Sequence, residues 1–573
     1  YNEHERKTSD AEGGICFSRA ISERAAGVAG GKARQRGLVS KGTQAFKSTQ
    51  KEGFSMSSKM TVKKEAIMAR FGGMGFHNSE ANVWREMDDV QFNQYVGKVY
   101  RELSPGFSRM WGGFPEWTKE EMDAFAEYCE KMQCKVGATI YLTGHCVRYE
   151  TDEELTAYAS NVADRLEYLI YEKGLSNVKI YCMSNELSLD DWGDLAFEMA
   201  TFKKYHTYLY NEFAHRHLPV YLLATDASPM ERWETVEWAI ANGMVPISNV
   251  FGGHHYVNDF EAEDLDFYKI FKRHCSDVVN MLKPYERRFI LGEFGLAQAF
   301  KQGQNNINGV KMDVCDAFYN GKESYSALQI CEMALAAVNA GVYAMALWTF
   351  VDVPNPRDLQ YRLNKWGLLR WDDTDYGARD WLYAYGLLVR YFRKNSKPLT
   401  ISSEDYLLRS GGVVNDDGSF SVAIVNRHKE PVEIDISLEN LKSDKALRRY
   451  LYDSANVPRS KFADLQDYDE LIACAGNSVH VTVPASSIVL LTTDYTDHKP
   501  AAITGICAED GTVTWEASTE AEHRYYRVYK GDSADFVPTK ENQVASTIAT
   551  SFTDPDAAPG FYKVESVDAW GNH

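Results

Sequence analysis

Short apolar runs alternate with amphipathic stretches from about residue 70 to residue 395. This alternation is typical of parallel strands covered by helices. We expect strands near residues 71–76, 106–110, 136–142, 178–183, 219–224, 247–252, 288–292 and 342–348. Helices are expected at Lys119–Met132, Asp152–Glu172, Asp194–His215, Asp264–Leu282 and Ser324–Ala340. Eight strands with helices between them predict an α/β fold, a (β/α)8 TIM barrel over residues 61–396.

The pattern changes to strands and turns after the barrel. Residues 397–496 contain strand-like runs such as Phe420–Val425 and Val479–Val483, with a turn at Asp416-Asp417-Gly418, and predict an all-β sandwich. Residues 497–573 carry a further strand set that resembles a fibronectin type III module. Modules of this kind fold alone on short linkers. We therefore expect a chain ended near Asp497 to keep its activity, and one ended near Lys397 to be insoluble.

The first 60 residues are rich in Gly, Ala, Ser, Lys and Arg, and predict a disordered tail. Residues 1–55 have no apolar core of the kind found in signal peptides. A cytoplasmic location is therefore the first expectation. Secretion is the alternative if the export signal is truncated or replaced.

Composition narrows the function classes. A chain of 573 residues is long enough for two to four domains. The net charge of -19 argues against nucleic acid or an anionic membrane surface as a partner, and no run of 18 apolar residues predicts a membrane span. The ten cysteines are scattered and favour reduced, buried thiols. Aromatic residues make up 13% of the chain, which suits sugar binding, although packing in a large barrel is the simpler interpretation. The oligomeric state stays unknown.

Two segments place a glutamate at the end of an apolar run. They are Ser184-Asn185-Glu186 and Gly292-Glu293-Phe294-Gly295. The 107 residues between the two glutamates divide into three strand-plus-helix units of about 35 residues. Because barrel enzymes carry their active sites at the C-terminal ends of the strands, both carboxylates are catalytic candidates.

These segments carry a family resemblance. Asn185-Glu186 after a fourth strand, Glu293 after a seventh and Trp348 on an eighth resemble the retaining glycoside hydrolases of clan A, which include cellulases, mannanases, β-xylosidases and β-glucosidases. The resemblance implies that Glu186 is the acid/base and Glu293 the nucleophile. It also implies that Asn185 holds the sugar 2-hydroxyl and that no cofactor takes part.

The resemblance extends to a second group of residues. Arg109 stands where the clan often has a strand-two arginine, and a cation beside Glu293 would keep that carboxylate ionised; a structural arginine is the alternative. His254-His255-Tyr256 resembles the clan's His-x-Tyr element, which implies that Tyr256 hydrogen-bonds Glu293 and that His254 contacts substrate. The alternatives are a polar loop and a zinc site. No third zinc ligand is evident, so no metal is expected.

Other aromatic and polar residues are candidates for holding the sugar. The resemblance implies that Trp348 is the platform under the sugar ring, with a core position as the alternative. Trp111 is a candidate for further stacking, as are two more loop tryptophans, Trp117 and Trp192. His77, Asn78 and His145 follow the first and third strands and are candidate ligands for hydroxyl groups, with a structural role equally open.

The chain departs from the commonest clan pattern at Leu187, where that pattern has proline. The departure leaves the substrate class open. We expect a retaining O-glycosidase that cleaves β-glycosidic bonds in an exo manner, with an endo-β-glycanase as the alternative. Rivals of other classes are a non-catalytic carbohydrate-binding protein and a metal-dependent barrel enzyme. The latter is disfavoured because Asp226 is the only acidic residue at the ends of the fifth and sixth strands.

Overall fold

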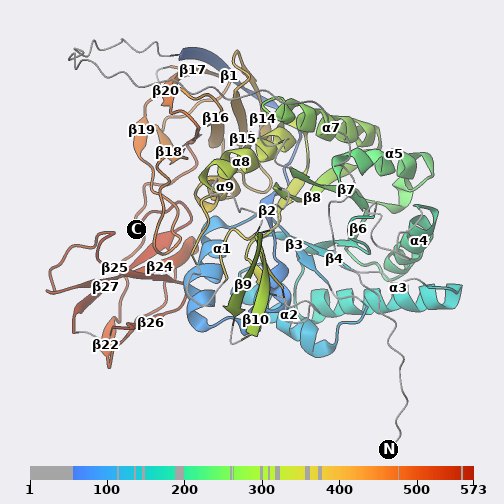
Figure 1. The fold of residues 1–573 in the computed structure, drawn as a ribbon, viewed down its shortest axis with the longest axis horizontal. Coiled ribbons are helices and arrows are strands. Elements are labelled where there is room, and N and C mark those ends of the chain that lie inside the picture. The colour runs from blue at the N-terminus through green and yellow to red at the C-terminus, as the bar shows by residue number, and fades with distance from the viewer. Residues whose placement is uncertain are drawn as a thin grey trace, which may run out of the picture.

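The computed structural model describes residues 56–573, apart from 113–114, 135–136, 145–148, 188–198, 258–260, 262–263, 297–300, 308–309, 317–322, 355–361, 372–376, 475 and 557–558. A barrel of parallel strands lies at its centre, with a large sheet on one side and a smaller C-terminal module beside it (Figure 1). No helix among the described residues is both long and apolar enough to cross a membrane.

Eight strands close the barrel in the order β11-β2-β3-β4-β5-β6-β7-β8. They are β2 (Gly73–His77), β3 (Phe107–Trp111), β4 (Thr139–Thr143), β5 (Val178–Cys182), β6 (Tyr221–Ala227), β7 (Val250–Val257), β8 (Arg288–Leu296) and β11 (Ala344–Leu347). Side chains such as Phe107, Ile180 and Ile290 form an apolar cluster of barrel-strand residues. The predicted (β/α)8 barrel is confirmed.

Helices follow most of the barrel strands and cover the barrel. They are α1 (Gly97–Leu103), α2 (Lys119–Lys131), α3 (Asp152–Glu167), α4 (Met199–His215), α5 (Glu234–Ala241), α7 (Phe267–Leu282), α8 (Glu323–Ala340) and α9 (Leu382–Tyr391). Thr118 and Thr151 begin α2 and α3 with capping boxes, in which the threonine hydroxyl accepts from the backbone of the third helical residue. The expected start of one helix at Asp194 lies outside the described residues.

A nine-stranded sheet follows the barrel, in the order β19-β18-β21-β16-β15-β14-β1-β17-β20. Its strands are β1 (Met56–Ala66), β14 (Lys397–Ser403), β15 (Leu408–Val414), β16 (Phe420–Asn426), β17 (Val432–Glu439), β18 (Leu447–Asp453), β19 (Glu470–Ile472), β20 (Ser478–Val483) and β21 (Ser487–Thr492). Val481 on β20, at one end of the sheet, and Leu447 on β18, next to the other end, belong to one buried cluster, against which Ile472 of β19 packs. The sheet therefore folds over on itself and forms the predicted sandwich.

Strand β1 belongs to this sheet and not to the barrel. It pairs antiparallel with β14 and parallel with β17, so that Val62 faces Ile401 on one side and Leu438 on the other. Met60 and Val62 are buried between exposed or half-buried neighbours. The predicted boundary at residue 60, between a disordered tail and the barrel, cuts through this strand. The stretch has only two large apolar residues on its buried face, which is why its strand pattern is weak.

Two three-stranded sheets make up the C-terminal module. Their orders are β22-β23-β26 and β25-β24-β27, and the strands are β22 (Cys507–Glu509), β23 (Thr512–Thr514), β24 (His523–Gly531), β25 (Gln543–Thr547), β26 (Ser551–Thr553) and β27 (Phe561–Asp568). Trp515, Tyr526 and Val528 lie in the cluster between them. A small β-sandwich is therefore present, and its assignment as a fibronectin type III module stays a prediction.

The C-terminal module packs against the barrel. Figure 1 shows it, in red, beside α1. The backbone N–H of Ile548 donates to the carbonyl of Asn93 in the helical turn Gln91–Val96 at 3.0 Å, and Arg524 donates to the hydroxyl of Ser104 at the end of α1 at 3.0 Å. The independent attachment that the sequence suggested is therefore not what the structure shows.

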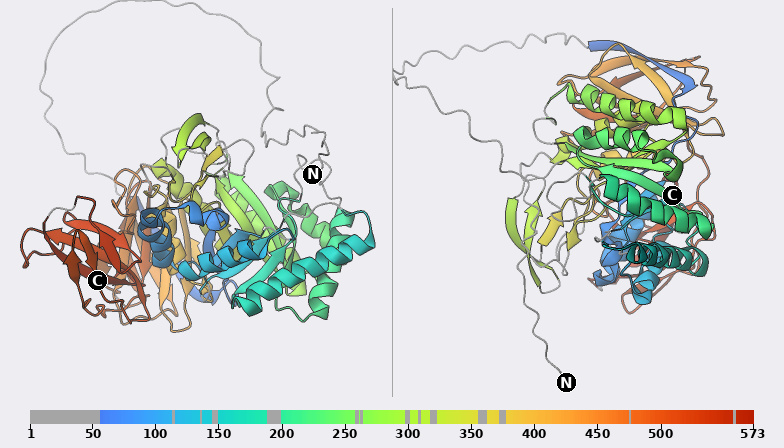
Figure 2. Two further views of the ribbon diagram at one scale, coloured as in Figure 1. Left: turned by 90° about the horizontal axis from the view of Figure 1, so that it is seen from below. Right: turned by 90° about the vertical axis from the view of Figure 1, so that its right-hand side faces the viewer.

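A separate four-stranded sheet stands at the C-terminal ends of the barrel strands. It contains β9 (Lys301–Ile307), β10 (Val310–Asp316), β12 (Val353–Pro354) and β13 (Arg362–Lys365), in the order β12-β13-β10-β9. The first two strands follow β8 and the other two follow β11, which is the neighbour of β8 in the barrel. Figure 2 shows the β9–β10 hairpin projecting from the body of the molecule.

Candidate active site

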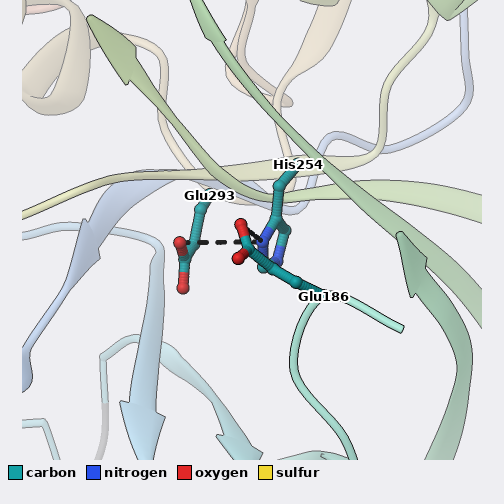
Figure 3. Close-up of side chains that lie close together, drawn as sticks. All are labelled: Glu186, His254 and Glu293. Carbon is teal, nitrogen blue, oxygen red and sulfur yellow. Dashed lines mark hydrogen bonds and ion pairs between the residues drawn. The ribbon is translucent and has the colours of Figure 1, made fainter. Parts of the chain in front are cut away.

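The two predicted glutamates meet at one end of the barrel. Glu186 follows β5 and Glu293 lies in β8. A carboxylate oxygen of each and a ring nitrogen of His254 all lie within 4.8 Å of one another (Figure 3). Glu293 is buried, whereas Glu186 retains 16% side-chain exposure. The C-terminal mouth of the barrel therefore holds a close carboxylate pair, of which one member is partly open to solvent.

Arg109 on β3 holds Glu293 in place. This fully buried guanidinium donates to Oε1 of Glu293, to Oδ1 of Asn185 at 2.6 Å and to Oδ2 of Asp226 at 3.0 Å. Burial alone would lower the pKa of Arg109, but Glu293 and Asp226 raise it overall. The arginine is therefore a permanent cation in contact with Glu293. It also orients Asn185, the residue before Glu186.

Tyr256 is the second donor to Glu293. Its hydroxyl donates to Oε2, the carboxylate oxygen that Arg109 does not bind. Burial raises the pKa of Glu293 above its ordinary value, while Arg109, His254 and the hydrogen bond from Tyr256 all lower it. Donors and cations stabilise the charged form of a carboxylate. Arg109, His254 and Tyr256 thus offset part of the effect of burial, and the pKa of Glu293 stays above its ordinary value.

His254 lies between three carboxylates. Its Nδ1 is 3.3 Å from Oε1 of Glu186 and 3.6 Å from Oε2 of Glu293, and its Nε2 is 3.1 Å from Oδ1 of Asp226. Burial lowers the pKa of His254, but the charges of Asp226 and Glu293 outweigh burial and raise it to about 10. The carboxylates around His254 therefore favour its imidazolium form, and Nδ1 is within hydrogen-bond distance of Glu186.

Asp226 at the end of β6 is part of the site, and sequence reasoning gave it no role beyond a metal ligand. It accepts from Tyr141 at 2.9 Å and from Arg109 at 3.0 Å. Burial would raise the pKa of Asp226, but His254 and Arg109 lower it to about 2. Asp226 and Glu186 both have left-handed backbone conformations, with φ of 53° and 50°. Such conformations cost about 1 to 3 kcal/mol and cluster at functional sites.

Aromatic rings form one wall of the site. The ring of Trp348, which follows β11, lies 4.5 Å from His77, 6.3 Å from Trp111 and 5.7 Å from Trp366, measured between centroids. Burial and the charges of Arg109 and His254 lower the pKa of His77 well below its ordinary value. His77 is thus a neutral ring, with Nε2 3.9 Å from Oε1 of Glu293. Trp366 was not among the predicted residues.

The remaining candidates lie elsewhere. The amide nitrogen of Asn78 donates to the hydroxyl of Tyr128 on α2 at 3.0 Å, so this group is engaged by the helical layer. Trp117 is buried against Phe125, with ring centroids 5.1 Å apart. His145 and Trp192 lie outside the described residues.

Glu186, His254 and Glu293 are also close enough to share one metal ion. The ion pairs and hydrogen bonds that these residues already make compete with that role. The Nδ1 of an imidazolium carries a proton and has no lone pair for a metal. Both oxygens of Glu293 already accept from Arg109 or Tyr256. The donor set fits an ion-paired cluster better than a metal centre.

No protein-family model matches the chain, and no curated protein matches its sequence. Solved structures do match its fold. The catalytic domain of GH30 xylanase C from Talaromyces cellulolyticus is 13% identical, with a TM-score of 0.54 over 76% of this chain and 99% of that one. A GH51 arabinofuranosidase from Xanthomonas axonopodis pv. citri is 13% identical, with a TM-score of 0.52 over 76% of this chain and 99% of the arabinofuranosidase chain.

A third match covers more of the chain. A bacterial orthologue of human α-L-iduronidase is 14% identical, with a TM-score of 0.58 over 90% of this chain and 98% of that one. Residues 497–573 make up more than a tenth of the sequence, so this match includes part of the C-terminal module. The barrel and its β-domain thus have the fold of clan A glycoside hydrolase structures, as the resemblance in sequence implied.

Proposed function

We propose that the protein is a retaining glycoside hydrolase, with Glu186 as acid/base and Glu293 as nucleophile. The observation that carries the proposal is the meeting of these two carboxylates, from β5 and β8, within 4.8 Å. Retaining glycosidases hold their carboxyl groups about 5 to 5.5 Å apart, whereas inverting enzymes need about 6.5 to 9.5 Å to admit a water molecule. The fold neighbours, which are themselves glycosidases, support the same reaction class.

Each side chain has a defined task in this reaction. In the first step Glu293 attacks the anomeric carbon, the glycosidic bond breaks, and Glu186 gives its proton to the departing oxygen. The cation of His254, 3.3 Å away, stabilises the carboxylate that Glu186 then becomes. In the second step Glu186 takes a proton from water, and that water displaces Glu293 from the sugar with net retention of configuration.

Other residues position the sugar. Asn185, oriented by its hydrogen bond from Arg109, is placed to hold the 2-hydroxyl group. The faces of Trp348 and Trp366 supply apolar surface for the C–H groups of a sugar ring. His77 is a neutral hydrogen-bonding group beside Glu293 and is suited to a second hydroxyl.

We propose exo action on β-glycosidic bonds. The sheet that contains β9, β10, β12 and β13 arises from the loops after β8 and β11. It therefore stands beside β8, which carries Glu293, and beside the end of β11, which Trp348 follows. A wall on one side of the mouth limits how far a polysaccharide can extend. An endo-β-glycanase is the alternative, because one fold neighbour is a xylanase and another is an endo-β1,6-glucanase.

The test is a panel of aryl glycosides that includes β-xylosides, β-glucosides, α-L-arabinofuranosides and α-L-iduronides. We expect the protein to turn over one of these glycosides. NMR should show that the first product keeps the anomeric configuration of the substrate. Inversion, or no turnover of any glycoside, would contradict the proposal. Products from an oligosaccharide series then separate the two modes, since exo action releases single sugar units from the first minute and endo action releases fragments of mixed length.

A further inference from the structure

We propose that Asp226 is a positioning residue of this site, which keeps His254 protonated and fixes Arg109 against Glu293 and Asn185. Asp226 is fully buried, and both of its oxygens face protein side chains, so we assign it no contact with a sugar. Its oxygens are directed to the side chains that do face the reaction. Oδ1 lies 3.1 Å from Nε2 of His254, and Oδ2 accepts from Arg109 at 3.0 Å.

The balance of charge explains why a third carboxylate is needed. Arg109 is a permanent cation, and Glu293 faces both Arg109 and His254. His254 has no exposed side-chain area, and burial alone lowers the pKa of a histidine and favours its neutral form. The groups around it are Glu186 after β5, Asp226 on β6, Glu293 on β8, and the more distant Arg109 on β3 and His77 on β2. Asp226 makes the shortest contact with His254 among these carboxylates.

Two glycines make the Asp226–His254 contact sterically feasible. A Cβ atom at Gly292, the residue before the nucleophile, would lie 2.9 Å from Oδ1 of Asp226 and 3.0 Å from Nε2 of His254. A Cβ atom at Gly252 on β7 would also lie 2.9 Å from Oδ1 of Asp226. Neither glycine has a backbone conformation that requires glycine, since neither has positive φ. The space that they leave therefore serves the carboxylate–imidazolium pair.

The consequence for chemistry rests on the proposed function. With Asp226 in place, His254 keeps its charge while Glu186 cycles between acid and carboxylate. Without Asp226, His254 becomes neutral and loses one of its three carboxylate neighbours, and Arg109 loses one of its three acceptors. Because Asp226 does not touch the sugar, its loss should lower kcat more than it changes KM.

The experiment follows the ring signals of His254 by NMR in protein labelled at histidine, with assignment by their loss in His254→Gln. In the wild type we expect an imidazolium that persists from pH 6 to pH 9. In Asp226→Asn we expect a neutral ring at pH 7. Gly292→Ala keeps Asp226 but separates it from His254, so the His254 ring should again be neutral at pH 7. This second variant tests the proposal even if Asp226→Asn does not fold. Asp435→Asn, which removes the exposed carboxylate 2.8 Å from His480, should leave the His254 signals unchanged.

The kinetic measurement uses an aryl glycoside that the wild type cleaves. Asp226→Asn should lose about 10- to 100-fold in kcat, with KM changed by less than about threefold. A His254 that titrates near its ordinary range in the wild type, or that stays charged in both Asp226→Asn and Gly292→Ala, would overturn the proposal. If the wild type cleaves no glycoside, the proposed function fails while the NMR result still decides the role of Asp226.

Discussion

Lys98 in α1 of the barrel and Asp464 in the β-domain lie 2.5 Å apart with no exposed side-chain area on the lysine. Lys98 also contacts Glu102 at 2.8 Å, and Arg527 of the C-terminal module lies 3.6 Å from the second oxygen of Asp464. All three domains therefore meet at one buried cluster of charges. Removing one member of a buried ion pair leaves the other uncompensated and costs several kcal/mol.

We predict that Lys98→Met destabilises the whole chain by about 3 to 5 kcal/mol, because Asp464 and Glu102 then lose a shared buried cation. The midpoint of urea denaturation measures the effect. Lys63→Met is the matched control, since Lys63 lies 3.8 Å from Glu439 on the surface with both side chains about half exposed. The control should change stability by less than about 1 kcal/mol. Equal midpoints for the two variants would refute the prediction.

Ending the chain at Asp497 should lower both soluble yield and melting temperature. This truncation removes Arg527, and it also removes Gln543 and Ser546, which donate to Asp464 at 2.9 and 3.0 Å. The side chain of Asp464 then loses three of its partners. The sequence suggested a module that is dispensable for activity, and the turnover of the truncated protein tests that separate expectation. A truncated protein that melts at the same temperature as the full chain would contradict the prediction about stability.

Glu186→Ala and Glu293→Ala should differ in their response to the leaving group. Help from a general acid matters only when the departing oxygen is a poor leaving group. Glu186→Ala should lose most activity on natural sugars but still form the intermediate from a dinitrophenyl glycoside, and added azide should release a glycosyl azide of retained configuration. Glu293→Ala should be inactive on both substrates, because no nucleophile remains.

The matched control for this pair is Glu332→Ala, a glutamate buried on α8 between Arg409 and Arg427 and outside the site. It should lower stability and leave the ratio of rates on the two substrates unchanged. If Glu186→Ala and Glu293→Ala respond alike to leaving group and azide, their roles are assigned wrongly.

Tyr256→Phe should move the acidic limb of the pH profile to higher pH. The hydrogen bond from Tyr256 lowers the pKa of Glu293, whose burial raises it. Without that bond the pKa of Glu293 rises further, so ionised nucleophile appears only at higher pH, and kcat/KM at the acidic end falls. Tyr452→Phe is the control, since its hydroxyl donates to the carbonyl of Ser324 at 2.6 Å, outside the site. An acidic limb that stays in place or moves to lower pH contradicts the prediction.

The sequence predicted those features that depend on neighbours along the chain. Glu186 and Glu293 each end an apolar run, and a strand that ends in a polar residue is a local signal. Parallel strands in a closed barrel bring their ends to one face, so two local signals were enough to predict a common site. Arg109 and Tyr256 followed from the family resemblance, and their contacts with Glu293 are in the structure.

Other features depend on contacts between distant segments. Asp226 lies two residues beyond the strand predicted near residues 219–224. Its pairing with Arg109 and His254 appears only in the fold, where β3, β6 and β7 bring the three side chains together. Trp366 contacts Trp348 from the segment after β13, where the sequence has no pattern of apolar and polar positions that predicts a strand or a helix. The C-terminal module meets the barrel at the buried charge cluster around Lys98, and nothing in the sequence distinguishes Lys98 from the other charged residues near it.

Strand β1 has a consequence for the synthesis of the chain. It leaves the ribosome before the barrel, yet its partners Ile401 and Leu438 follow Val62 by more than 300 residues. Because the ribosome adds about 5 to 20 residues per second, both edges of β1 stay unpaired for on the order of 20 to 70 s. During that time the barrel strands can close without it. The pairing of β1 with β14 and β17 is therefore a late event in folding, and the unpaired edge of β1 is where a chaperone or a second nascent chain would bind.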